Sequence, residues 1–204
     1  MPGIGRLGRI PVATPMPLGV TDLRYDILRD PEVLGYTHRQ ENVTFSVGFL
    51  PRLTLTARGT IAKDSLTGED LTRDLSAGAS LQLVTERGWR PAIAAGMQDV
   101  GGKASNFRTA YVVADRTLFG RARITAGYGD GPDVLKGVFG GVQLTVWPAL
   151  SVFAEHDTKA LNAGVRVLPF PERWIARGVP RPSVDFLWQQ DHGASVALGV
   201  RTGL

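Results

Sequence analysis

The regular alternation of apolar and polar residues is the feature that most constrains the fold of this chain. Residues 42–49 read Asn-Val-Thr-Phe-Ser-Val-Gly-Phe, and residues 53–61 repeat the pattern with threonine and arginine at the polar positions. Successive side chains of a β-strand point to opposite faces, so a period of two is typical of strands with one apolar and one polar face. We therefore expect an all-β protein, with strands at 22–28, 42–50, 53–62, 75–85, 91–99, 107–118, 121–129, 138–147, 150–157, 161–168, 183–190 and 194–203.

The number and the length of these strands favour a barrel that crosses a membrane. There are twelve, an even number, and most have eight to eleven residues. A tilted strand needs about 9–11 residues to cross a bilayer, whereas strands in soluble proteins average nearer 5–6. The 25 glycines lie within apolar segments as well as between them, which disfavours helices. The predicted fold is an antiparallel up-and-down transmembrane β-barrel of about twelve strands; a soluble β-sandwich is the alternative.

Short and long connections alternate along the chain. Those after the second, fourth, sixth and eighth strands are short, whereas 29–41, 63–74 and 130–137 are longer and more polar. Alternate connections of an up-and-down barrel share a rim, so one rim would carry tight turns and the other longer loops. This asymmetry is typical of bacterial outer-membrane barrels, and the bacterial outer membrane is the expected location.

Aromatic residues follow the same rhythm, because one group falls at each short connection. Trp and Tyr prefer the boundary between bilayer and water, so these rings would form a membrane-interface belt; in a sandwich they would belong to the core. The predicted belt comprises Phe49, Trp89, Phe119, Trp147, Phe170 and Trp174. A second, looser belt at the other rim would use Tyr25, Phe107, Tyr128, Phe139 and Trp188.

Charged residues occupy the polar face of several strands. In a barrel they would face the lumen, because an arginine in the middle of the membrane costs about 2–4 kcal/mol. We expect these charges to solvate and brace the interior; a path for anions is the alternative, because arginines outnumber carboxylates among them. The predicted lumen-lining residues are Arg24, Asp26, Arg58, Arg123, Glu155, Arg166, Asp185 and Arg201.

Residues 1–20 stand apart from the predicted barrel, which comprises 21–204. They contain four prolines and two arginines without an apolar run, so they do not have the pattern of a secretory signal. We expect an extended segment that lies on the periplasmic rim or enters the lumen as a plug. In the second case Arg6 and Arg9 would pair with carboxylates of the lumen.

Residues suited to catalysis or metal binding are few. The chain has no cysteine, which excludes disulfides, thiolate zinc sites and a cysteine nucleophile. Its histidines are His38, His156 and His192, and the cluster of Asp191, His192 and Ser195 lacks the glycine pattern of a nucleophile elbow. We therefore expect no catalytic residue, no metal and no cofactor. The net charge of +4 is spread along the chain and does not indicate a nucleic-acid partner.

Several segments of the sequence resemble one known protein family. The run at 89–102, Trp-Arg-Pro-Ala-Ile-Ala-Ala-Gly-Met-Gln-Asp-Val-Gly-Gly, is similar to a run that precedes a strand like 107–114 in the YjbH-like outer-membrane proteins of bacteria. Other similar segments, in the same order as in the family, are 8–19, 137–142, 154–157 and 162–166. Within these segments turn geometry explains the polar motif positions at least as well as a functional role; they are Asp99, Glu155, Asp157 and Asn162.

The resemblance implies an outer-membrane β-barrel linked to exopolysaccharide production or export. The leading expectation is a non-enzymatic barrel that is a structural or assembly component of the envelope, or a narrow conduit for polysaccharide or small solutes. Its partners would be outer-membrane lipid, other envelope proteins or polysaccharide. The alternatives from other classes are a barrel enzyme acting on lipid or glycan at the outer rim through His156 or His192, and a soluble all-β binding protein.

Overall fold

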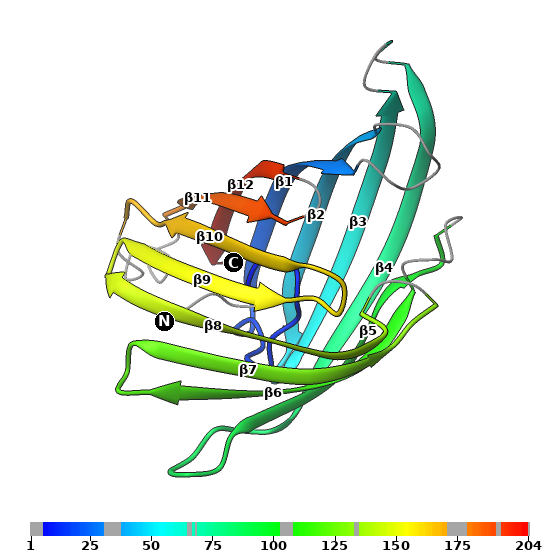
Figure 1. The fold of residues 1–204 in the computed structure, drawn as a ribbon. Coiled ribbons are helices and arrows are strands. Elements are labelled where there is room, and N and C mark those ends of the chain that lie inside the picture. The colour runs from blue at the N-terminus through cyan, green and yellow to red at the C-terminus, as the bar shows by residue number, and fades with distance from the viewer. Residues whose placement is uncertain are drawn as a thin grey trace.

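One antiparallel sheet that closes on itself forms the protein. The computed structural model describes residues 6–30, 38–64, 67, 69–102, 108–132, 135–170, 179–190 and 193–203. Each described strand pairs with its neighbours in sequence, and β1 pairs with β12 to close the barrel (Figure 1). The strands are β1 Val20–Asp30, β2 His38–Leu50, β3 Leu53–Asp64, β4 Asp70–Val84, β5 Ala92–Val100, β6 Thr109–Leu118, β7 Ala122–Asp130, β8 Gly137–Trp147, β9 Leu150–His156, β10 Leu161–Val167, β11 Arg181–Gln189 and β12 Gly193–Gly203.

The predicted architecture is confirmed, because all twelve expected strands occur among the described residues. β4 departs most from its predicted bounds and begins at Asp70, five residues early. Arg73 and Asp74 pair there with the end of β3, although their polar sequence has no apolar alternation. The sandwich alternative is wrong, because the first and last strands are hydrogen-bonded to each other and no second sheet is present among the described residues. No described helix is long and apolar enough to cross a membrane.

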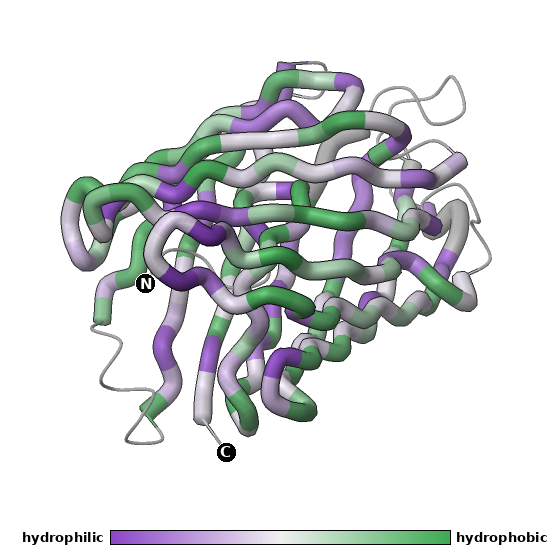
Figure 2. The backbone as a smooth tube through the Cα atoms, turned by 90° about the horizontal axis from the view of Figure 1, so that it is seen from below, coloured by the Kyte–Doolittle hydropathy of each residue, from purple (hydrophilic) through white to green (hydrophobic). Residues whose placement is uncertain are grey.

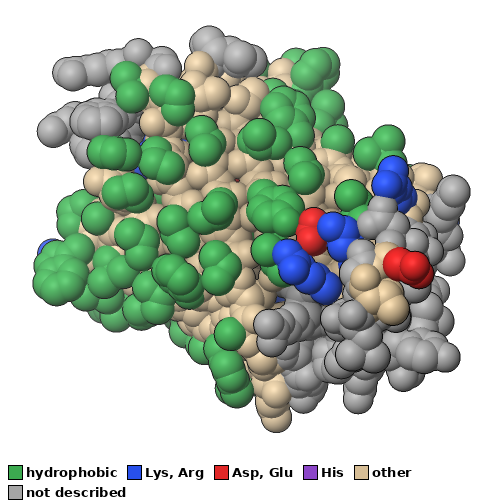
Figure 3. All heavy atoms as spheres, turned by 90° about the horizontal axis from the view of Figure 1, so that it is seen from above, with side chains coloured by type: hydrophobic (Ala, Val, Ile, Leu, Met, Phe, Trp, Pro, Cys, Tyr) green, Lys and Arg blue, Asp and Glu red, His purple; other side chains and the backbone are tan. Residues whose placement is uncertain are grey.

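Alternation divides the strands into an outer apolar face and an inner polar face. Val43 and Phe45 on β2 are 49% and 45% exposed on the outside, whereas Thr44 and Ser46 line a cavity in the interior. Figure 2 shows apolar and polar residues alternating along the strands, and apolar side chains cover much of the outer surface in Figure 3. The outside of the barrel is therefore suited to lipid and its inside to water and charge.

The short connections are tight hairpins. Phe119 and Gly120, between β6 and β7, have φ angles of 53° and 66°. Two consecutive positive φ values are what a type I′ turn requires, and the twist of that turn matches the twist of paired strands. Arg52, between β2 and β3, also has a positive φ of 74°, and its carbonyl accepts a hydrogen bond from the Gln82 N–H at 2.9 Å. This hydrogen bond holds the turn at Arg52 against the neighbouring strand β4.

The apolar core lies inside the barrel and is formed by strand residues together with residues 6–19, called the N-terminal segment below. Leu7, Ile10 and Val12 are almost completely buried, and they cluster with side chains of β5, β6, β8 and β9. Figure 1 shows the segment in dark blue among the strands. The core therefore occupies one side of the lumen, which leaves polar side chains on the other.

Phe139 does not belong to a surface belt, and this part of the prediction is wrong. Its side chain is 1% exposed and points inward, while Val138 takes the outer position. Gly127 makes room for the ring, because a Cβ at that position would lie 2.3 Å from Phe139 Cζ. The sequence of 137–141 contains no polar residue, so alternation could not show which face is inside. Among the other residues of the looser belt, Tyr128 and Trp188 are exposed, Tyr25 is half-buried and Phe107 lies outside the described residues.

We expect an arginine on the outer face to destabilise the barrel in a bilayer according to its depth. Val142→Arg, in the middle of β8, should lower the free energy of unfolding by about 2–4 kcal/mol, because the charge would face hydrocarbon. Phe119→Arg, in an exposed turn, should cost about 0–1 kcal/mol. Equilibrium unfolding by urea from phospholipid vesicles measures both. Equal costs at the two positions would contradict a membrane-facing outer wall.

Candidate functional site: the interior of the barrel

A single carboxylate holds the start of the N-terminal segment. Glu155, on β9, is buried and accepts hydrogen bonds from the backbone N–H groups of Gly8 at 2.9 Å, Arg9 at 2.6 Å and Ile10 at 3.4 Å. Consecutive N–H groups that converge in a tight turn form a concavity that binds anions, and here the anion is a side chain. Gly8 permits the close approach, because a Cβ there would lie 2.6 Å from the ring of Phe153. The wall thus fixes the segment by one buried charge.

Further hydrogen bonds carry the N-terminal segment across the interior. Arg166 Nη2 donates to the Leu7 carbonyl at 2.7 Å, and the Ala13 N–H donates to Asp115 Oδ2 at 2.8 Å. The Met16 N–H donates to Thr54 Oγ1 at 2.9 Å. These partners lie on β10, β6 and β3, on different sides of the barrel. Additional bonds join Gln82 Nε2 to the Ala13 carbonyl and Arg123 Nη2 to Thr14 Oγ1, each at 3.1 Å.

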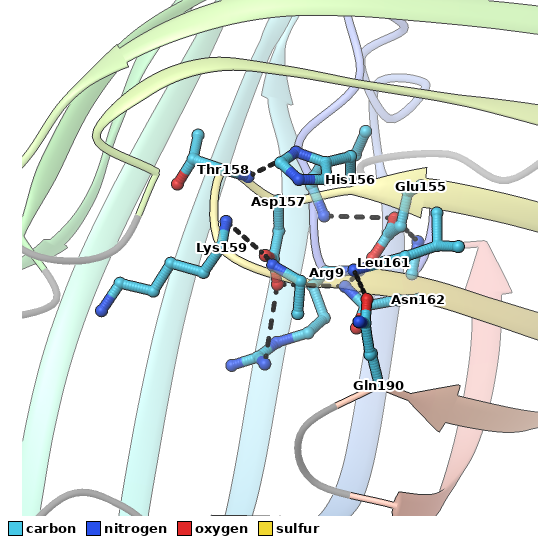
Figure 4. A network of polar contacts seen from close by, with 12 residues as sticks. Arg9, Glu155, His156, Asp157, Thr158, Lys159, Leu161, Asn162 and Gln190 are labelled. Atoms are coloured by element: carbon cyan, nitrogen blue, oxygen red, sulfur yellow. Dashed lines mark hydrogen bonds and ion pairs between the residues drawn. The ribbon is translucent and has the colours of Figure 1, made fainter.

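The turn between β9 and β10 is organised by Asp157. Its Oδ1 accepts from the N–H groups of Lys159 at 3.2 Å and Ala160 at 3.0 Å, and its Oδ2 lies 3.7 Å from Arg9 Nη1 (Figure 4). Burial raises the pKa of Asp157, but the Ala160 N–H, the Arg9 charge and Asn162 outweigh it, so the pKa is lowered overall. A lowered pKa means that Asp157 stabilises the fold above its unfolded pKa. This contribution is lost as the pH falls through the folded pKa.

Four of the residues predicted to line the lumen, Arg24, Arg58, Arg166 and Arg201, line the interior cavity, and the other four, Asp26, Arg123, Glu155 and Asp185, are buried. Asp185 is the centre of one network: Arg166 donates Nε to Oδ1 at 2.9 Å and Nη2 to Oδ2 at 2.7 Å, and Arg24 Nη1 lies 2.8 Å from Oδ2. These contacts join β10, β11 and β1. Such paired bonds between arginine and carboxylate are strong and have a defined geometry. The charges therefore brace the wall.

The remaining predicted lumen residues also have partners. Arg58 forms an ion pair with Asp99, and Arg201 Nε donates to Asp22 Oδ1 at 3.1 Å. Asp26 Oδ2 accepts from Asn42 Nδ2 at 2.9 Å. Arg123 Nε lies 4.0 Å from Asp115 Oδ2, and Glu155 holds the N-terminal segment as described above.

A cavity of about 120 Å³ remains between the N-terminal segment and the opposite wall. Its wall side is formed by β1 to β6 and β10 to β12, and it carries the hydroxyl groups of Thr44, Ser46, Thr56, Ser76 and Ser80. Cationic side chains outnumber anionic ones around it. Among the described residues, the charged groups that line it are Arg6, Arg9, Arg24, Arg58, Arg166, Arg181, Arg201, Asp22 and Asp99.

The predicted aromatic belt lies at the rim of short connections. Trp89 and Phe119 are 91% and 96% exposed, and Phe49, Trp147 and Phe170 also have exposed rings. The Arg116 guanidinium lies 5.1 Å from the centre of the Trp89 ring, a cation–π contact. Trp174, the remaining predicted member, lies outside the described residues.

The histidines do not form a catalytic cluster within the described part of the chain. His156 is exposed, and its Nδ1 accepts a hydrogen bond from the Thr158 N–H at 3.3 Å. Ser195 Oγ donates to the Leu187 carbonyl at 3.4 Å, while Asp191 and His192 lie outside the described residues. The described residues also contain no group of three or more His, Asp or Glu side chains placed to hold a metal.

The sequence did not indicate how the charged residues pair. Asp22 and Asp115 were not predicted, and Asp99 was explained only by turn geometry, although all three are the partners of predicted arginines. The period of two could have indicated Asp22, because it precedes Arg24 and Asp26 by even steps. Arg9 forms the expected ion pair with a carboxylate, whereas Arg6 has no hydrogen bond or ion pair of its guanidinium among the described residues.

The fold and its polar interior define a porin-like outer-membrane β-barrel. The structure is similar to a KdgM porin, with a TM-score of 0.60 and 13% sequence identity over 91% of this chain and 99% of that chain. A KdgM porin in complex with disordered oligogalacturonate matches with the same TM-score, 12% identity and the same coverage. An outer-membrane channel from Pseudomonas putida F1 matches with a TM-score of 0.53 and 10% identity, over 93% of this chain and 97% of that chain.

The family comparison agrees with the resemblance seen in the sequence. Residues 33–132, just under half of the chain, match the YjbH family, described as "Exopolysaccharide biosynthesis protein YbjH". The predicted resemblance to YjbH-like outer-membrane proteins is thereby confirmed over these residues. No curated protein matches the chain.

We expect Glu155→Gln to destabilise the protein, because an amide replaces the charge that accepts three backbone hydrogen bonds. Hydrogen bonds to a charged group contribute about 1.5–3 kcal/mol, and the free energy of unfolding should fall by that amount. The exposed Glu69→Gln is the matched control and should change it by less than about 0.5 kcal/mol. Urea unfolding of the refolded protein measures both. A loss no larger than that of the control would show that Glu155 does not anchor the segment.

Proposed function

We propose that this protein is an outer-membrane barrel whose lumen is a narrow passage for saccharide, linked to exopolysaccharide export. The observation that carries the proposal is the hydroxyl- and arginine-lined cavity left between the N-terminal segment and the wall. A lumen with polar walls and solvent space is the feature that separates a conduit from a barrel filled by its own side chains.

The outer surface supports placement in a lipid bilayer. Large apolar side chains are exposed on strands all around the barrel, among them Leu23, Val142 and Leu198. A soluble protein rarely exposes so much contiguous apolar surface, because it drives aggregation. The exposed rings at Trp89 and Phe119 match the aromatic girdle that borders the apolar band of membrane barrels.

The comparisons support the choice of a saccharide. The matched family is described by its part in exopolysaccharide biosynthesis, and one structural neighbour is a porin in complex with an oligogalacturonate. Hydroxyl side chains suit such a ligand, because each can both donate to and accept from a sugar hydroxyl. The cavity wall offers several of them on neighbouring strands.

A structural or assembly role is the second candidate. The N-terminal segment is tied to strands on different sides of the barrel, which favours a lumen that stays largely filled. The proposal of a passage requires that this filling be incomplete or reversible. The enzyme alternative has less support, because the structural neighbours named above are porins and channels.

Removal of residues 1–18 distinguishes the first two candidates. If the N-terminal segment narrows a passage, single-channel conductance in planar bilayers should be small for the full chain and rise several-fold for the truncated one. Gel migration serves as the control for a closed barrel. The refolded full chain should migrate faster before heating than after it. Conductance absent from both proteins would contradict the passage and favour the structural role. Unchanged conductance with unchanged stability would show that the segment does not obstruct the lumen.

A further inference from the structure

Two arginines and a threonine form a row across three neighbouring strands of the cavity wall. Arg24 on β1 is the register partner of Thr44 on β2, and Thr44 is the register partner of Arg58 on β3. All three line the cavity. Adjacent strands lie about 4.8 Å apart, so the three backbones are close neighbours. The guanidinium of Arg24 pairs with Asp185 and that of Arg58 with Asp99, and both arginines line the same cavity as Thr44.

Two donors in this row have no hydrogen-bond partner. Thr44 is only 5% exposed, and its Oγ1 is buried without a partner; the same is true of Arg58 Nε. A buried donor without an acceptor costs about 1–3 kcal/mol, so such groups are rare in native proteins. Both residues line the cavity, so an acceptor group that enters the cavity can satisfy these donors.

The N-terminal segment supplies a third cation. Arg6 lines the same cavity, and its guanidinium has no hydrogen bond or ion pair among the described residues. Burial, followed by the charge of Arg24, lowers the pKa of Arg6 to about 10, against the attraction of Asp26; Arg58 also lowers it. Arg6 therefore stays protonated at neutral pH. Arg24 and Arg58 are already paired with Asp185 and Asp99, whereas Arg6 has no paired carboxylate in the described part of the chain, and an anion in the cavity would offset its charge.

One buried acceptor in the cavity is also unpartnered. Asp99 pairs with Arg58 through one oxygen, and its second oxygen, Oδ2, is buried without a hydrogen bond. A simple inorganic anion would be repelled by this carboxylate and would offer it no donor. A hydroxyl group would satisfy it. The site thus combines donors for an anionic group with an acceptor for a hydroxyl.

We propose that Arg24, Thr44 and Arg58 of the wall, together with Arg6 of the N-terminal segment, bind the carboxylate of a uronic-acid saccharide, one of whose hydroxyls donates to Asp99. The inference rests on the proposed passage for saccharide and adds to it the charge of the saccharide. It also makes the N-terminal segment part of the binding site. Neutral sugars and bare inorganic anions each satisfy only half of the site.

The test measures binding of trigalacturonate to the detergent-solubilised full chain by isothermal titration calorimetry. Maltotriose is the neutral saccharide of equal length, and sulfate is the anion without sugar hydroxyls. We expect trigalacturonate to bind and the other two to bind at least about tenfold more weakly, because each loses hydrogen bonds to charged groups. Equal binding of maltotriose would overturn the anionic site. If sulfate binds as tightly as trigalacturonate and displaces it, the site binds inorganic anions in general, and the saccharide assignment is overturned.

Variants at Arg6 and Thr44 locate the site without breaking an ion pair. Arg6→Gln removes a charge that has no paired carboxylate, and Thr44→Val removes the hydroxyl while keeping the shape. Each substitution should weaken trigalacturonate binding about tenfold. Arg6→Lys keeps the positive charge and should therefore bind more tightly than Arg6→Gln. Arg121→Gln, in an exposed turn at the rim, is the matched control and should leave binding unchanged. Migration on gels before and after heating checks that each variant is folded.

The two proposals can fail separately. If the chain conducts in bilayers but trigalacturonate does not bind, or binds with the same affinity to Arg6→Gln, the uronate site is wrong and the passage stands. If trigalacturonate binds in the expected order but neither the full nor the truncated chain conducts, the passage is wrong and the site belongs to a closed barrel.

Discussion

The pairing of β1 with β12 is the interaction on which the rest of the structure depends. It runs from Val20 with Gly203 to Ile27 with Val196, and it leaves no sheet edge between the first and last strands. In hydrocarbon an unpaired backbone N–H or C=O costs several kcal/mol, so only a closed sheet can present its outer face to lipid. Closure also creates an inside, and every polar side chain on the inner face must then find its partners there.

Those partners come from two sources. Strand charges pair across the wall, as Asp185 does with Arg24 and Arg166. The N-terminal segment brings backbone donors to Glu155, a carboxylate for which the wall itself supplies little compensation. Removing one partner of a buried ion pair is costly, because it leaves the other charge buried without compensation. The N-terminal segment therefore occupies part of the interior through both its backbone donors and its apolar side chains.

The strands, their number and their faces were predictable, because alternation is a local property and lipid and water are the two environments it separates. The prediction succeeded for Val43 and Phe45, which neighbour clear polar positions. It failed for Phe139, where glycines on both sides hide the period, and for the start of β4, where pairing with β3 holds polar residues in a strand.

The sequence by itself determined the all-β character, the outward and inward sets of side chains and the alternation of short and long connections, because each depends on residues close together in the chain. Only the tertiary structure decided which charges meet. Arg6 and Arg58 line one cavity although 52 positions separate them (58 − 6), and Glu155 meets the backbone of Gly8 147 positions away. Such contacts follow from closure and register, which bring distant strands and the N-terminal segment into one enclosed volume, and no local pattern records them.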